Sequence, residues 1–77
     1  MNITELRNKI FELGISDELY SILQGGLPNE KLCLVKEESW KIYYSEHGKR
    51  TGEKTYDSEE EACEAFFRKI KRYSEIQ

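Results

Sequence analysis

Alternating apolar and polar residues in the middle of the chain predict a small β-sheet. Residues 40–44 carry aromatic or aliphatic side chains at every second position, and successive side chains of a strand point to opposite faces. Such residues suit a half-buried pleated surface. The two expected faces carry Trp40, Ile42 and Tyr44 on one side and Lys41, Tyr43 and Ser45 on the other.

Two flanking strands complete the predicted sheet. Residues 32–35 are apolar throughout, which is typical of a strand with partners at both edges or cover on both faces. Residues 52–56 are mostly polar and include Lys54 and Thr55, which predicts a short, exposed edge strand. Turns are expected at Glu37-Glu38 and around Gly48, where a positive φ suits glycine. The pattern predicts a three-stranded antiparallel meander.

Helical periodicity predicts one helix at each end of the chain. The segment Asn2–Leu13 begins with a capping box at Asn2 and is followed by Gly14, a common residue just past a helix end. The last helix begins with a capping box formed by Ser58 and Glu61. The apolar stripes consist of Ile3, Leu6, Ile10 and Leu13, bordered by Phe11, in the first helix and of Ala62, Phe66, Ile70 and Tyr73 in the last.

The segment between the first helix and the sheet leaves two alternatives. Ser16, Asp17 and Glu18 favour the cap of a short helix, whereas Tyr20–Leu23 favours a short extra strand. Residues 24–29 hold the only proline and the pair Gly25-Gly26, which predicts a loop. The spacing is not that of a phosphate-binding loop.

These elements predict one α+β domain over residues 1–77. The expected fold consists of an N-terminal helix, a three-stranded antiparallel sheet and a C-terminal helix packed on the sheet. A short extra strand near 20–23 is an alternative. The expected core buries Trp40 and Ile42 against Phe66 and Ile70.

The charge and hydropathy of the chain limit its partners. The formal net charge is −3, which disfavours nucleic acid, since nucleic acid requires a basic face, and favours a basic protein partner. No apolar run approaches the ~20 residues that cross a bilayer, and the N-terminus has no signal-peptide pattern. We therefore expect a cytoplasmic protein.

The candidate reactive residues are few. Cys33 and Cys63 fit no zinc or redox spacing and are expected to be buried, free thiols. The only histidine, His47, lies in a predicted turn. Because a nucleophile needs a base within reach, we expect no enzymatic activity, and no motif indicates a metal or a cofactor.

Acidic residues form the main candidate for partner binding. They lie at one expected hairpin, around the next, and at the start of the last helix. The dipole of that helix also favours acids at its start and bases toward its end, where the chain carries Arg68, Lys69, Lys71 and Arg72. Tyr43 is expected to be an exposed anchor on the open sheet face. The predicted partner-binding residues are Glu37, Glu38, Tyr43, Glu46, Glu53, Asp57, Glu59, Glu60 and Glu61.

Two family resemblances bear on function. The order helix, three strands, helix resembles the double-stranded-RNA-binding fold, but such domains place basic residues where this chain carries its acids at 57–61, so RNA binding is not expected. The segments GGLPNE at 25–30, LCL at 32–34, WKIYYSE at 40–46 and YDSEEEAC at 56–63 resemble small immunity proteins of bacterial polymorphic toxin systems, including contact-dependent growth inhibition. This likeness spans about residues 20–67.

The second resemblance implies a cytosolic protein that binds the C-terminal toxin domain of a cognate secreted effector, commonly a nuclease, and neutralises it without catalysis or cofactor. It carries no binding residue over to this chain. The alternative is a small protein-binding adaptor or regulatory domain without a toxin partner. Either is expected to be a monomer, or a weak homodimer formed through the polar third strand.

Overall fold

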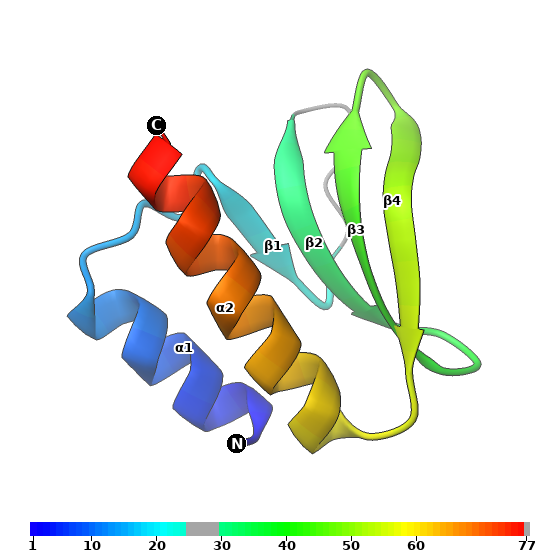
Figure 1. Cartoon of the computed structure of the whole chain (residues 1–77), viewed down its shortest axis with the longest axis horizontal. Helices are drawn as coiled ribbons and strands as arrows, with labels where there is room; N and C mark the ends of the chain where they lie inside the picture. The colour runs from blue at the N-terminus through cyan, green and yellow to red at the C-terminus, as the bar shows by residue number, and fades with distance from the viewer. Residues whose placement is uncertain (25–29, 77) are drawn as a thin grey trace.

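The chain forms an α+β structure in which a sheet is covered on one face by a helix (Figure 1). A computed structural model describes residues 1–24 and 30–76. The loop predicted at 25–29, including Gly25-Gly26, lies outside the described residues. The elements in chain order are α1 (Ile3–Glu12), β1 (Tyr20–Ile22), β2 (Lys31–Lys36), β3 (Trp40–Glu46), β4 (Lys49–Tyr56) and α2 (Glu59–Ile76).

The sheet is mixed, with strand order β1-β2-β3-β4. Strands β2, β3 and β4 form the predicted antiparallel meander. The segment near 20–23 is a strand, which settles the two alternatives, and it pairs in parallel with β2, an orientation that the sequence pattern did not predict. Backbone bonds from Leu32 N to Leu19 O at 3.0 Å and from Leu23 N to Leu34 O at 2.7 Å complete this pairing.

The second hairpin has the predicted glycine turn. Glu46 pairs with Lys49, so the loop is His47-Gly48, with φ values of 50° and 80°. Positive φ at both positions is typical of a type I′ turn, which matches the twist of the strands. Strand β4 has 8 residues and is longer than the sequence predicted, but it is exposed along its length apart from Tyr56, as expected for an edge.

Both predicted N-caps are present. The Asn2 side chain accepts a hydrogen bond from Glu5 N at 2.8 Å, and Ser58 Oγ accepts one from Glu61 N at 3.2 Å. Gly14, at φ 70°, ends α1 with the paired backbone bonds of a Schellman motif.

The apolar stripe of α1 is narrower than predicted. Leu6 and Ile10 are fully buried, whereas Leu13 is 52% and Phe11 83% exposed. The helix ends at Glu12, so Leu13 lies in its C-cap, and Phe11 points to solvent.

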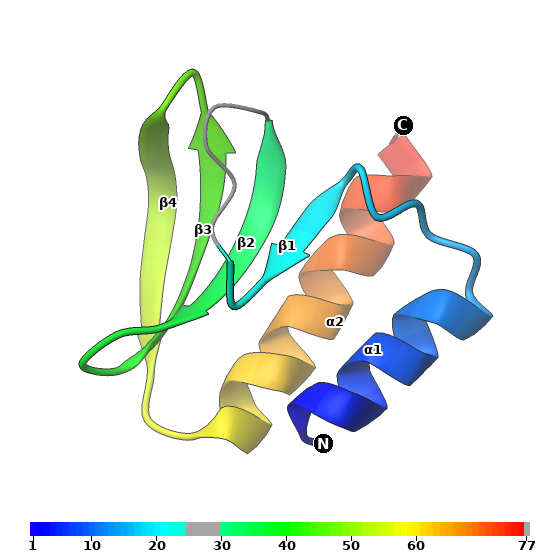
Figure 2. The same ribbon diagram turned by 180° about the vertical axis from the view of Figure 1, so that it is seen from behind.

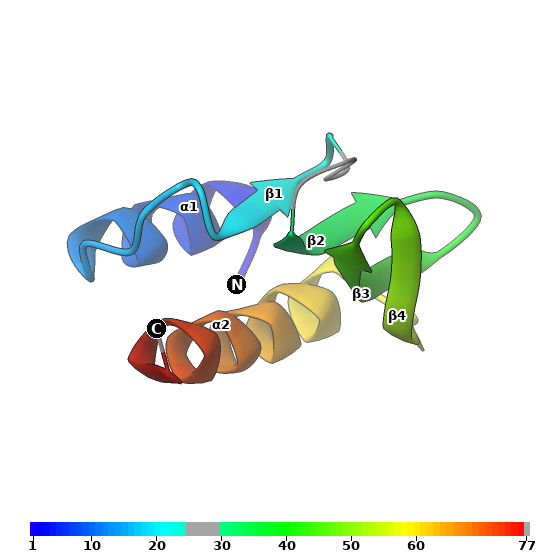
Figure 3. The ribbon, with the colours of Figure 1, turned by 90° about the horizontal axis from the view of Figure 1, so that it is seen from above.

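The core lies between the sheet and the helices. Figure 3 shows α2 on one side of the sheet, with α1 beside it beyond the β1 edge, where the Arg7 guanidinium donates to Ile22 O at 3.3 Å. Ile42, Phe66 and Ile70 are buried in one cluster, as predicted. Trp40 packs only at the margin of this cluster and stays partly exposed, which the prediction of a fully buried Trp40 missed.

The C-terminal half of α2 is tied to β3 by two tyrosines. The hydroxyls of Tyr44 and Tyr73 lie 3.2 Å apart, and the rings meet edge to face. The hydrogen bond to Tyr73 and burial raise the pKa of Tyr44. In the described part of the chain, no helix is long and apolar enough to span a bilayer.

Candidate interaction surfaces

Among the described residues, no helix covers the face of the sheet opposite α2 (Figure 2). Tyr43 lies on this face, as the alternation predicts, but it is only 3% exposed and packs with Cys33 and Val35. The Arg50 guanidinium lies over its ring, 4.4 Å from the centroid. The prediction that Tyr43 is an exposed anchor is therefore wrong, because a neighbouring cation and two apolar side chains cover the ring.

An ion cluster holds Arg50 over the tyrosine. Its two terminal nitrogens donate to Glu37 at 3.1 and 2.9 Å, and one also contacts Glu53 at 3.1 Å. Lys41 Nζ lies 3.3 Å from Glu37. The hydrogen bonds from Arg50 and Lys41 lower the pKa of Glu37 to about 2, and those with Glu37 and Glu53 raise the pKa of Arg50. Two of the predicted partner-binding acids, Glu37 and Glu53, are thus neutralised within the molecule.

Glu38 and Glu46 are exposed at the tips of the two hairpins. Beside Glu46, the carboxylate of Glu30 lies 3.8 Å from His47 Nε2, and ligand atoms of these three residues lie within 4.8 Å of one another. All three are exposed, so the group is a solvated cluster of two acids and one imidazole. His47 is a solvated turn residue, as the sequence predicts.

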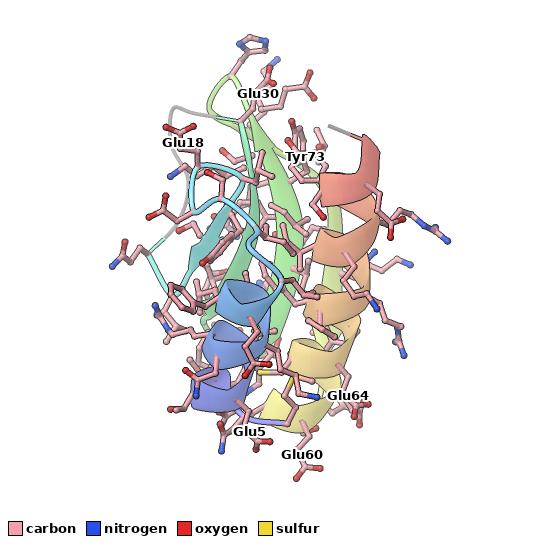
Figure 4. The ribbon with its side chains drawn as sticks, turned by 90° about the vertical axis from the view of Figure 1, so that its left-hand side faces the viewer. Glu5, Glu18, Glu30, Glu60, Glu64 and Tyr73 are labelled. Atoms are coloured by element: carbon pink, nitrogen blue, oxygen red, sulfur yellow. The ribbon has the colours of Figure 1, made fainter. Side chains whose placement is uncertain are left out.

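The starts of both helices lie at one end of the molecule. The Glu59 carboxylate accepts a hydrogen bond from Ile3 N at 2.9 Å, which joins the first turn of α2 to the first turn of α1. Figure 4 shows Glu5, Glu60 and Glu64 together at this end. We call this region the acidic end; its members are Glu5, Asp57, Glu60, Glu61 and Glu64, all exposed.

The acidic end has a physical cause. Two adjacent helix N-termini present the positive ends of their dipoles in one place, and carboxylates in the first turns offset that field. Among the described residues, none of these five carboxylates has an ion-pair partner. Sequence reasoning missed Glu5, since only tertiary packing brings α1 beside α2. The last turn of α2 holds no base, because the helix continues to Ile76 and the predicted bases between Arg68 and Arg72 lie before that turn.

The two thiols are poorly suited to nucleophilic chemistry. Both cysteines are free and fully buried, as predicted. Burial raises the pKa of Cys63 to about 11 and also raises the pKa of Cys33. A thiol that stays protonated at neutral pH is a weak nucleophile.

Comparisons of the chain with protein-family models, with curated proteins and with solved structures find no match.

Proposed function

We propose that the chain is an immunity protein that binds the C-terminal toxin domain of a cognate secreted effector and neutralises it. The observation that carries this proposal is the acidic end, where five exposed carboxylates have no partner in the described chain. Such a concentration of one charge favours a basic protein partner by steering its approach. The segments that resemble immunity proteins support the same role.

In this proposal the protein acts in the cytoplasm as a binding protein, with no catalysis and no cofactor. The partner domain contacts Asp57, Glu60 and Glu61 first. Glu38 and Glu46 extend the contact at the hairpin tips, while Glu37, Glu53 and Tyr43 hold the sheet face in shape, and Glu59 joins the helices. The chain is a monomer or a weak homodimer through the exposed edge of β4.

The proposal requires a large secreted protein encoded immediately upstream, and the test is co-expression with the C-terminal domain of that protein. We expect survival of the host cells and co-purification of the two chains. Co-purification without protection from toxicity would favour the adaptor alternative, and the absence of both would contradict the proposal.

Charge variants locate the surface. Replacing Glu60 and Glu64 by Gln should slow association about three- to tenfold at low salt and reduce its salt dependence. The control removes the same charge at the other ends of the helices, with Glu12→Gln and Glu75→Gln. Equal association rates for the two double variants, measured by surface plasmon resonance, would place the interface elsewhere.

A further inference from the structure

A basic groove lies between the edge strand β4 and the flank of α2. Its volume is about 320 Å³, at the small end of the range for ligand pockets. The groove is lined by Lys54, Tyr56, Ala65, Arg68, Lys69 and Arg72.

The spacing of these residues explains why they share one groove. Ala65, Arg68, Lys69 and Arg72 follow the periodicity of one helix face. Lys54 pairs across the sheet with Ile42 and Tyr56 with Trp40, so both lie on the face toward α2. Ala65 is buried and small, which leaves the space between the strand and the helix open.

The four cations are not compensated. In the part of the chain that the structure describes, none of Lys54, Arg68, Lys69 and Arg72 has an ion-pair partner. Four like charges around one small groove repel one another, in a chain whose net charge is −3. A bound anion would remove this repulsion and so stabilise the fold.

We propose that this groove binds an oligophosphate, either the phosphate chain of a nucleotide or a free short phosphate chain such as tripolyphosphate. Arginine presents paired donors that suit phosphate oxygens, and lysine adds point charges. Several cations in one small site match the several negative charges of a phosphate chain better than they match the single charge of a carboxylate. A long polyanion lying along α2 is disfavoured, because Glu60, Glu61 and Glu64 would repel it.

Isothermal titration at low salt and without metal ions tests the site with tripolyphosphate, ATP and adenosine. We expect 1:1 binding of the first two and none of adenosine. The test variant is Lys54→Gln with Arg72→Gln, and affinity should fall at least about tenfold. The control, Lys49→Gln with Lys71→Gln, removes the same charges from β4 and α2 outside the groove and should change affinity less than about threefold.

The probes also identify the source of the phosphate chain. ATP bound about tenfold more tightly than tripolyphosphate indicates a nucleotide, and equal affinities indicate the chain alone. The proposal is overturned by no binding up to about millimolar ligand, by equal losses in the two double variants, or by binding of ATP without tripolyphosphate. If duplex RNA displaces tripolyphosphate at physiological salt and loses affinity in the test variant, that result would replace the oligophosphate proposal with nucleic-acid binding.

Discussion

Arg50 and Glu37 decide the character of the open sheet face. The guanidinium stacks over Tyr43 while both carboxylate oxygens of Glu37 hold it from the hairpin. A paired, bidentate contact of this kind fixes both side chains in one geometry. As a result, the ring of Tyr43 is packed rather than offered to a partner.

Replacing Tyr43 by Ala should destabilise the native state by about 3 kcal/mol, because it leaves a cavity beside Cys33 and Val35. That is a large share of the roughly 4–11 kcal/mol expected for a chain of this size. Tyr43→Phe keeps the ring and should cost less than about 1 kcal/mol. Urea unfolding measures both, and similar midpoints for Ala and Phe would mean that the ring is not packed.

The ion pairs of Glu37 make stability depend on pH. The pKa of Glu37 is lowered from 4.5 to about 2 by its hydrogen bonds to Arg50 and Lys41. Because the folded-state pKa is the lower one, the contribution is fully present above about pH 4.5 and is lost as the pH falls toward 2. Glu37→Gln should flatten the stability profile in that window. A variant profile parallel to the wild-type one between pH 5 and 2, measured by urea midpoints at about unit steps, would contradict this prediction.

Helix α2 owes its start to a local motif and its position to both neighbours. Ser58 caps the first turn, Glu59 bonds to the first residue of α1, and Phe66 fills the core against the sheet. The cap acts within three residues, so it is independent of packing.

Ser58→Ala should cost about 1 kcal/mol, since Glu61 N loses its acceptor. The matched control is Ser74→Ala in the same helix, where the hydroxyl donates to Lys71 O rather than capping a helix start. The control should be neutral or slightly stabilising, because Ala is the better helix former. Thermal unfolding followed by circular dichroism measures the stability of both variants. Equal losses of stability would show that the Ser58 cap does not stabilise α2.

The whole molecule has a polarised charge map. Two helices start at the acidic end, and the basic groove lies farther along α2, against β4. Both surfaces exist because α2 contacts α1 on one flank and faces the edge strand on the other.

This charge distribution predicts that the protein does not bind nucleic acid. The wild-type chain should show no saturable binding of duplex RNA at physiological salt, because the acids of α2 oppose the phosphates. Replacing Glu60, Glu61 and Glu64 by Lys should extend the positive charge of Arg68, Lys69 and Arg72 toward the start of the helix. The variant should then bind duplex RNA, with an affinity that weakens steeply as salt is added. Fluorescence anisotropy with a labelled duplex is the measurement. Micromolar binding of the duplex by the wild-type chain would contradict the proposal of a basic protein partner.

Much of the fold follows from interactions between near neighbours in the chain. The caps at Asn2 and Ser58, the turn at Gly48 and the two faces of β3 all depend on residues within a few positions of one another. Local hydrogen bonds and strand alternation therefore determined them from the sequence by itself. The pairing of three strands followed because short hairpins leave few alternatives.

Only the tertiary structure decided the features that join distant segments. Four features depend on where whole elements pack: the parallel pairing of β1 with β2, the position of Arg50 over Tyr43, the place of Glu5 at the acidic end, and the groove between Lys54 and Arg72. A charged residue has the same sequence signature whether its neighbour in space is water, a carboxylate or another cation. Its role is set by long-range packing, because the energy of a charge depends on what lies within a few ångströms of it.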